Sequence, residues 1–418
     1  MAEARFLAAA DLHLGRPIAS LPEALRPEAR ALGPLGALER LVELARHERV
    51  DAVLLAGDVV DDDGAYFEVF EALQQAIRGL GNIPLIAIAG NHDAKILPRL
   101  AKGMEGLTLL GEGGSWQTVE VQTPLGGVEV LGWSFPDTHC RASPFDRPPP
   151  PRKNRRLGLL HCDLDTSASV YAPCTSGQLR AHAADAWLLG HVHVPSIGGS
   201  AGASPAGYLG SVCGLDPSES GPRGAWLVRI DAAGASLESR AIAPIAWVRV
   251  DAPAEALTAH GLDATLHRLS SDASVDYEHA QAVGVRMALV GEHEHWQEIA
   301  RAADGLELGQ PWTHLGRRVF LESVECRLSA PLPLERLAQE RSVVGRIAGL
   351  VLELQSGGQE GLVREAENRF AEIGRDRNLC VPSLGERCWP LPDARATLAR
   401  EARAVLSELL AQSGPGVG

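Results

Sequence analysis

The chain has 418 residues, a formal net charge of −14 and a hydrophobic fraction of 45%, so it is long enough for two or three domains with buried cores. The acidic balance argues against a protein that coats nucleic acid non-specifically, and no apolar run reaches the length of a membrane span. The N-terminus lacks a basic segment and a cleavage site, so we expect a cytoplasmic protein. Its seven cysteines are an odd number without CxxC spacing, which predicts idle thiols rather than a disulfide framework.

The first hundred residues alternate between strand-like and helix-like patterns. Apolar runs at 5–10, 51–57 and 83–90 predict three buried strands. Between them, apolar residues recur at helical spacing in two sets, which are Leu35, Leu38, Leu41, Val42 and Ala45, then Phe67, Phe70, Leu73, Ile77 and Leu80. This βαβαβ rhythm indicates parallel strands with covering helices, and in such layers ligands gather at the carboxyl ends of the strands.

From about residue 115 the pattern changes to shorter strands, at WQTVEVQ, VEVLGWSF, RLGLLH, AWLLGH, AGYLGS and AWLVRID. Two sheets sandwiched between helices would accommodate all of them. We therefore expect an α/β fold with a two-sheet αββα sandwich over residues 1–245. A smaller α/β capping domain is expected over 246–330, with two strands and a helix at about 253–270, and a helical region over 331–418.

A Pro-rich basic segment, RPPPPRKNRR (147–156), precedes the strand-like segment RLGLLH. One interpretation is a solvated loop, because Pro runs are stiff and charged side chains stay hydrated. The other is a loop at the mouth of the site that contacts phosphate. The sequence leaves both open.

Potential metal-binding side chains follow the apolar runs in order, within the motifs ADLHLGR (10–16), GDVVD (57–61), GNHD (90–93), LLH (159–161) and GHVH (190–193). The candidate metal ligands are Asp11, His13, Asp58, Asn91, His161, His191 and His193. Carboxylate, imidazole and amide groups suit Mn²⁺, Fe²⁺ or Zn²⁺. The set is large enough for two metals that share a bridging carboxylate and clamp a phosphoryl group.

Spacing gives a reason for these side chains to meet. If strand geometry continues past Ala10, Asp11 and His13 project on the same side, and His191 and His193 have the same spacing. Two such pairs on neighbouring strand ends would close around one small volume.

Motif order and context over residues 5–230 resemble the calcineurin-like metallophosphoesterases, and within them the SbcD-like exonucleases of DNA double-strand-break repair. The stretch YAPC (171–174), followed by DAWLLGHVH and YLGSVCGLDPSESGPRGAWLVRID, resembles the YhaO-type bacterial branch. The resemblance implies one metal held by Asp11, His13, Asp58 and His193. It implies a second metal held by Asp58, Asn91, His161 and His191.

The resemblance also implies catalytic residues. His92 would face the phosphate, stabilise the developing charge and protonate the leaving oxygen. Asp93 is a candidate to orient His92 by accepting a hydrogen bond from its other ring nitrogen, and Asp61 a candidate to support the metal-site loop. Ordinary turn chemistry explains Asp93 and Asp61 equally well. We interpret His139 as an exposed loop residue.

By resemblance, the function is that of a Mn²⁺-dependent phosphodiesterase acting on DNA, a 3′-to-5′ exonuclease with some endonuclease capacity. The implied partners are a coiled-coil SMC-type ATPase, for which helices after 331 are docking candidates, and a second copy of the chain. Those helices have the alternative of packing on the second domain. Alternative functions are a small-molecule or cyclic-nucleotide phosphodiesterase or phosphatase, which the same metal pair can serve, and a non-catalytic scaffold subunit of a repair complex.

Overall fold

The computed structural model describes the chain except for residues 1, 62–65, 167, 199–203, 374–392 and 413–418. Contacts group the chain into two compact units. Unit 1 comprises 1–248, 273–285 and 309–322, and unit 2 comprises the remaining segments, 249–272, 286–308 and 323–418. The expected domain limits at 245 and 330 stay predictions.

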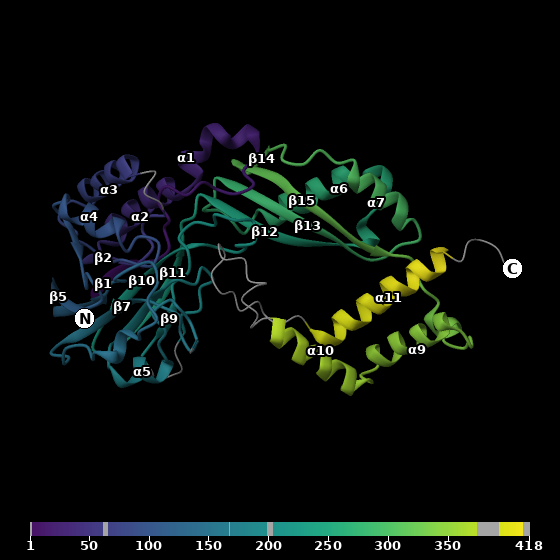
Figure 1. Cartoon of the computed structure of the whole chain (residues 1–418). Coiled ribbons are helices and arrows are strands. Elements are labelled where there is room, and N and C mark those ends of the chain that lie inside the picture. The colour runs from purple at the N-terminus through teal and green to yellow at the C-terminus, as the bar shows by residue number, and fades with distance from the viewer. Residues whose placement is uncertain (1, 62–65, 167, 199–203, 374–392, 413–418) are drawn as a thin grey trace. The chain divides into compact units, whose positions relative to one another are not determined.

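The first sheet of unit 1 has the strand order β11-β10-β1-β2-β3-β4 (Figure 1). Its strands are β1 (Ala4–Ala9), β2 (Ala52–Ala56), β3 (Leu85–Ile88), β4 (Leu107–Leu109), β10 (Gly224–Ile230) and β11 (Ala235–Ala241). Strands β1 to β4 run parallel, whereas β10 is antiparallel to both of its neighbours. The three strands predicted in the first hundred residues are confirmed.

The second sheet has the order β5-β6-β7-β8-β9. Its strands are β5 (Trp116–Thr123), β6 (Gly126–Trp133), β7 (Arg155–His161), β8 (Ala186–Gly190) and β9 (Ala206–Tyr208). Strands β6 to β9 are parallel, and β5 forms an antiparallel hairpin with β6. All five correspond to short strands expected from the sequence.

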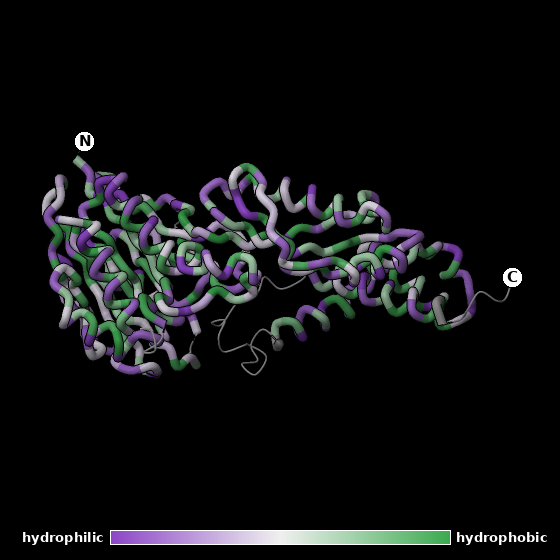
Figure 2. Tube along the Cα trace, turned by 90° about the horizontal axis from the view of Figure 1, so that it is seen from above, coloured by the Kyte–Doolittle hydropathy of each residue, from purple (hydrophilic) through white to green (hydrophobic). Residues whose placement is uncertain are grey.

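The two sheets pack face to face, and the buried residues between them include Phe6 and Leu54 of the first sheet and Val130 and Leu159 of the second. The outer face of the first sheet is covered by α2 (Pro34–Glu48), α3 (Tyr66–Leu80) and α4 (Ile96–Lys102). The outer face of the second is covered in part by α5 (Ser176–Ala181). The expected αββα sandwich is confirmed, and the apolar strand segments appear in green in Figure 2.

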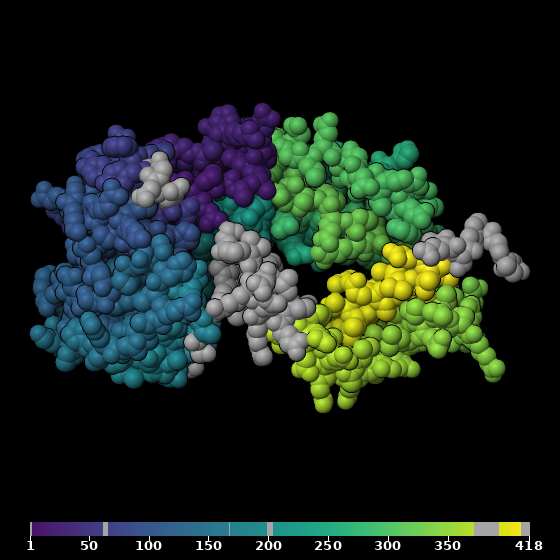
Figure 3. All heavy atoms as spheres, viewed as in Figure 1, coloured from purple at the N-terminus to yellow at the C-terminus, as the bar shows by residue number. Residues whose placement is uncertain are grey.

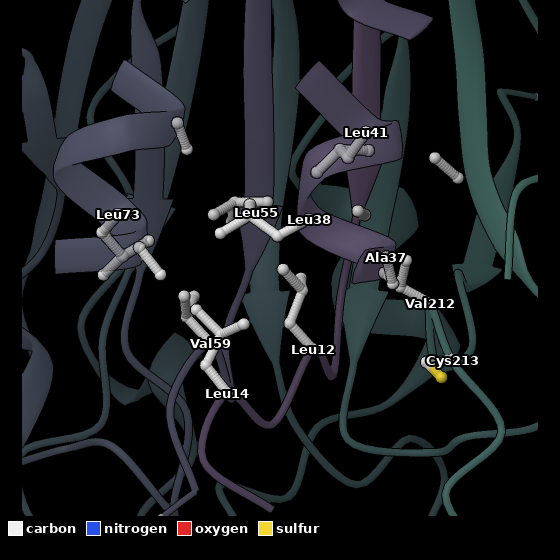
Figure 4. Packing of buried hydrophobic residues seen from close by; sticks show 14 of the residues in the cluster. Leu12, Leu14, Ala37, Leu38, Leu41, Leu55, Val59, Leu73, Val212 and Cys213 are labelled. Carbon is white, nitrogen blue, oxygen red and sulfur yellow. The ribbon is translucent and has the colours of Figure 1, made fainter. Parts of the chain in front are cut away.

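Two helical stripes predicted from spacing form α2 and α3. Leu38 and Leu41 of α2 and Leu73 of α3 lie over Leu55 of β2 (Figure 4). One member of the second stripe is misplaced, because Phe67 is 86% exposed. The short elements η1 (Glu23–Glu28) and α1 (Ala29–Leu32) precede α2.

A four-stranded sheet follows, in the order β12-β13-β15-β14. Its strands are β12 (Ile245–Pro253), β13 (Ala282–Glu292), β14 (Trp312–His314) and β15 (Arg317–Ser329). The helices beside them in the chain are α6 (Leu262–Ala273) and α7 (Trp296–Asp304). Strands β12 and β13 confirm the prediction, whereas the helix expected at 253–270 begins only at Leu262, after two short 3-10 turns. The hairpin β14–β15 was not expected.

The region after 331 is helical, as predicted, with α8 (Leu334–Leu337), α9 (Val343–Gln355), α10 (Glu360–Ile373) and α11 (Ala394–Gln412). Side-chain caps start two of these helices: Ser342 accepts from the Gly345 amide, and Asp393 accepts from the Ala396 amide at 3.0 Å. Helices α8, α9 and α11 share a small apolar core, and α9 to α11 form the yellow-green group of Figure 3. None of the described helices is both long and apolar enough to cross a membrane.

Each of the five cysteines in the described part of the chain is a free thiol. Cys380 and Cys388 lie outside the described residues. Sγ of Cys162 lies 3.3 Å from Sγ of Cys174, and the expectation of idle thiols stays a prediction.

Candidate metal centre

The candidate ligands lie where the carboxyl ends of both sheets meet. Asp11, Asp58 and Asn91 follow β1, β2 and β3 of the first sheet. His161 ends β7 and His191 follows β8, both in the second sheet. The two pairs, Asp11 with His13 and His191 with His193, do meet, since the His191 amide donates to Asp11 Oδ1 at 3.0 Å. They follow strands of different sheets, β1 and β8. The site lies at the edge of the sandwich, where segments from both layers converge.

The backbone around Asp11 also differs from the expected strand. Strand β1 ends at Ala9, and Asp11 and His13 have left-handed φ angles of 52° and 49°. Leu12 and Leu14 contribute to the core below α2 and α3 (Figure 4). Apolar residues that point to the core therefore alternate with Asp11 and His13, although the segment is not a strand. Left-handed φ at such residues costs on the order of 1 kcal/mol each and is typically retained at functional sites.

The structure brings all seven candidate ligands and His92 together. Three groups of possible ligand atoms share members, with the atoms of each group within 4.8 Å of one another; the groups are Asp11, His13 and His193, then His13, Asp58 and His92, then Asp58, His161 and His191. Oδ1 of Asn91 lies 3.1 Å from Nε2 of His161 and 3.0 Å from Nδ1 of His191. This donor set fits divalent transition metals. The assignment of each residue to one of two metals stays a prediction.

Every candidate histidine ligand has an outer partner on its other ring nitrogen. Nδ1 of His13 lies 2.8 Å from Asp61 Oδ1, and Nδ1 of His193 lies 2.6 Å from Glu219 Oε1. Nε2 of His191 lies 3.1 Å from Asp163 Oδ1, and Nδ1 of His161 lies 3.1 Å from the carbonyl oxygen of Ala56. Sequence reasoning missed Glu219, since nothing in its spacing connects it with His193.

His92 has the exposed imidazole of the cluster, with 41% of its side chain accessible, and its Nδ1 lies 3.4 Å from Asp61 Oδ1.

The prediction that Asp93 orients His92 is wrong. Its carboxylate is fully buried and accepts backbone N–H groups from Gly90 and Val59, each at 2.7 Å. Asp93 therefore ties the loop after β3 to the loop after β2, and Asp61 is the carboxylate beside His92.

The charges of the cluster are strongly coupled in the metal-free protein. Burial lowers the pKa of His161, but the charge of Asp58 and the hydrogen bond that His161 donates to it raise that pKa to about 9. Burial opposes ionisation of Asp58, and its histidine neighbours nevertheless hold the pKa of this carboxyl well below its usual range. Burial and the nearby charge of Asp58 raise the pKa of Asp93 to about 7.

Two glycines allow the loops to approach this closely. A Cβ on Gly90 would lie 2.2 Å from Asp58 Oδ1, and a Cβ on Gly57 would lie 2.5 Å from Nδ1 of His161. Gly57 also has a φ of 91°, in the left-handed region that glycine adopts at no steric cost. The glycines of GDVVD and GNHD are thus required by the packing of the ligands.

The basic segment 147–156 runs into the amino end of β7, about 20 Å along the strand from His161 at its carboxyl end. Three of its four arginines are paired there: Arg152 and Arg155 with Asp185 at 2.6 and 2.8 Å, and Arg156 with the buried Glu129. The fourth is Arg147, whose carbonyl oxygen accepts from the indole N–H of Trp116. The phosphate-contacting interpretation is therefore wrong for Arg152, Arg155 and Arg156.

His139 is exposed, as expected, and lies near the site. Its ring stacks on Tyr171 with the centroids 5.7 Å apart, and Tyr171 lies 4.8 Å from the ring of His191. The loop that carries His139 thus borders the cluster.

Residues 4–195 match the family model of the calcineurin-like phosphoesterases. This region is thus similar to the calcineurin-like phosphoesterase domain over the part of the chain that holds the cluster. It contains every candidate metal ligand together with His92, whereas Glu219 lies beyond its end. The phosphoesterase domain therefore accounts for the cluster of carboxylates and imidazoles at the edge of the sandwich.

The chain is 24% identical over 320 residues to the uncharacterized metallophosphoesterase YhaO of Bacillus subtilis, covering 70% of this chain and 72% of that protein. Among solved structures it is similar to TT1561 of Thermus thermophilus, with a TM-score of 0.35 and 16% identity over 56% of this chain and 98% of the other. A dimetal phosphatase from Danio rerio is similar with a TM-score of 0.34 and 14% identity, over 54% of this chain and 92% of that one.

Proposed function

We propose that the phosphoesterase domain hydrolyses phosphodiester bonds in DNA, as a Mn²⁺-dependent 3′-to-5′ exonuclease with endonuclease capacity. The observation that carries the hydrolytic part is the set of three overlapping groups of possible ligand atoms joined through His13 and Asp58, one of which includes the exposed His92. Two divalent ions held there would supply Lewis-acid polarisation of the phosphoryl oxygens and a nucleophile at neutral pH.

The residues of the chain have separate tasks in this proposal. Asp58 and Asn91 would supply oxygen ligands, since Asp58 Oδ2 lies 3.3 Å from Nε2 of His161 and Asn91 Oδ1 lies 3.0 Å from Nδ1 of His191. The backbone N–H of His92 donates to Asp58 Oδ1 at 2.9 Å, so the loop that carries the catalytic imidazole is attached to the metal-binding carboxylate. Asp61 lies beside His92 Nδ1, which leaves Nε2 available for the phosphate or the leaving oxygen.

The DNA substrate is favoured by the organisation of the chain beyond the catalytic domain. The family model ends at residue 195, and the chain continues into a second compact unit with its own sheet segments and helices. A small phosphate ester needs no such addition, whereas a polymer benefits from further contact surface. The same metal cluster could also act on small phosphodiesters, so the assay must include them.

The test compares the wild-type chain with His92→Ala in the presence of Mn²⁺, using linear duplex DNA, single-stranded DNA, bis-p-nitrophenyl phosphate and a cyclic nucleotide. We expect degradation of DNA from 3′ ends, and a roughly 10²- to 10⁴-fold lower rate for His92→Ala. Metal content of both proteins is measured in parallel and should be equal. Efficient hydrolysis of the small esters with intact DNA would replace DNA as the substrate, and full metal occupancy without any hydrolysis would favour the scaffold alternative.

We also propose two protein partners. The first is a coiled-coil SMC-type ATPase that docks on the C-terminal helices, where Val343 of α9 is 57% exposed and Val405 of α11 is 48% exposed. The second is another copy of the chain, which would cover Phe67 on α3. Exposed apolar side chains on packed helices support both proposals.

A further inference from the structure

We propose that Glu219 is a positioning residue of the metal centre, which holds the imidazole of His193 so that its Nε2 faces the same point as Nε2 of His13. The proposal rests on the metal-binding part of the proposed function and not on the DNA substrate. Glu219 lies beyond the phosphoesterase family region and in the sequence resembles an ordinary loop residue.

The carboxylate of Glu219 contacts the imidazole of His193 at the ring nitrogen that faces away from the other candidate ligands. Glu219 Oε1 lies 2.6 Å from Nδ1 of His193, and both side chains are buried, with 3% and 8% of their surface exposed. On the other side of the ring, Nε2 of His193 lies 3.1 Å from Nε2 of His13. Because Nδ1 donates to Glu219, the lone pair of His193 is on Nε2, where a metal can bind.

The carboxylate of Glu219 is itself held in place. Its second oxygen, Oε2, accepts from the hydroxyl of Ser211 at 3.3 Å and from the backbone N–H of Leu215 at 3.2 Å. Arg223 completes the arrangement, because its guanidinium donates to the backbone carbonyl of His193. The loop between β9 and β10 therefore fixes both the ring and the backbone of one predicted ligand.

Glu219 and Asp61 occupy equivalent positions on the two facing histidines but differ in what else they contact. Asp61 lies beside His13, His92 and Arg16, and 20% of its side chain is exposed. Glu219 contacts His193 and the loop that holds it, and it is buried away from His92. Substituting Asp61 would therefore disturb His13 and His92 together, whereas substituting Glu219 should disturb His193 and the loop between β9 and β10.

The expected consequence is a selective loss of metal affinity. A carboxylate acceptor on the far nitrogen raises the basicity of an imidazole ligand, and its removal typically weakens metal binding by about 10- to 100-fold. Glu219→Gln keeps an acceptor of similar size but removes the charge, so we expect about 10-fold weaker binding at one of two sites. Glu219→Ala removes the acceptor as well, and we expect about 100-fold.

The matched control is Glu129→Gln. Glu129 is also a buried carboxylate with a single strong ionic partner, Arg156, but it lies in β6 and pairs at the amino end of β7, away from the ligands. Its substitution should lower the unfolding temperature and leave metal affinity unchanged. A merely structural role of Glu219 predicts that both Glu219 variants behave like this control.

The experiment is titration of Mn²⁺ into metal-free wild-type, Glu219→Gln, Glu219→Ala and Glu129→Gln chains by calorimetry, with the Mn²⁺ electron paramagnetic resonance signal as a second readout. One weakened binding step in the two Glu219 variants, with both steps intact in the control, is the expected result. Unchanged binding in Glu219→Ala overturns the proposal.

A measurement on the wild-type chain keeps the proposal testable if the variants fail to fold. In the zinc-loaded protein, ¹⁵N chemical shifts should show His193 protonated at Nδ1 and ligated through Nε2. Ligation through Nδ1, or protonation at Nε2, overturns the proposal. Neither readout involves DNA, so a failure here is distinguishable from a failure of the nuclease proposal.

Discussion

Asp58 shows how one residue can depend on several distant segments. Its side chain lies 3.3 Å from Nε2 of His161, and the His92 amide donates to it. In the turn after β2, Asp58 has a left-handed φ of 49°. The preceding Gly57 and the facing Gly90 leave room for the side chains of His161 and Asp58, with which a Cβ at either glycine would collide. A negative charge so deeply buried is stable only with charged partners, which are the histidines in the metal-free protein and would be metal ions in the loaded one.

Replacement of a protonated histidine by a metal ion as the partner of Asp58 predicts that protons are released when metal binds. Because the pKa of His161 is about 9 in the metal-free protein, its imidazole carries a proton at about pH 7.5, and a metal ion must displace it. We expect release of at least one proton per chain at that pH, and a release that falls as the pH rises through the pKa of His161. Apparent metal affinity should correspondingly rise with pH up to that value.

Calorimetry of metal binding in buffers of different ionisation enthalpy measures this proton release directly. The control is His161→Gln, which should release about one proton fewer than the wild type under the same conditions. An enthalpy of binding that is the same in all buffers below the pKa of His161 would show that its imidazole is already neutral.

At the scale of elements, the polar residues of the site lie in the turns after strands, and the apolar residues of the same turns anchor those turns in the core. The helices after residue 331 are different, because α8, α9 and α11 bury apolar residues against one another and still expose Val343 and Val405. Packing therefore explains part of their apolar surface but not these two side chains.

The partner proposal predicts an effect of these exposed positions on binding. We expect Val343→Asp combined with Val405→Asp to weaken binding of a purified SMC-type ATPase by about 10-fold or more, since each substitution places a charge in an apolar contact. The unfolding temperature should change little, because neither side chain is buried. Val275→Asp, at a residue that is 42% exposed elsewhere in the chain, is the control, and equal affinity of the double variant and this control would refute the docking site.

At the scale of the whole molecule, the candidate metal cluster lies within unit 1, while the described residues of unit 2 provide none of the candidate ligands. Unit 1 also carries Phe67, an exposed ring in contact with Tyr66, whose ring lies below the guanidinium of Arg99 at 5.5 Å. Phe67 is 86% exposed, and a second copy of the chain would cover it in the proposed homodimer.

The homodimer proposal predicts that Phe67→Asp shifts the chain towards monomer. Burying one Phe side chain contributes about 1.5–3 kcal/mol, and a symmetric dimer buries two, so the dissociation constant should rise at least about 100-fold. Sedimentation velocity over a range of concentrations measures the shift. Leu315→Asp is the control, at a residue of unit 1 that is 66% exposed in the turn before β15. A wild-type chain that remains monomeric at every concentration would contradict the proposal.

The sequence by itself determined the elements and the ligand types. Continuous apolar runs predicted β1, β2 and β3, and apolar residues at helical spacing predicted α2 and α3, because the spacing of apolar residues reflects how an element is buried. Polar residues directly after apolar runs predicted the ligands, because parallel strands bring their carboxyl ends to one edge.

Only the tertiary structure decided how those pieces meet. Two sheets converge on the cluster, and Asp61 rather than Asp93 lies beside His92. Glu219 contacts the far nitrogen of His193, and three of the four arginines of 147–156 are paired away from the site. The spacing of residues in the sequence predicts none of these contacts, because each joins segments that lie far apart in the chain. The spacing of apolar residues predicts which face of a helix or strand is buried. The partner of a buried charged group depends instead on how the two sheets and their loops pack together.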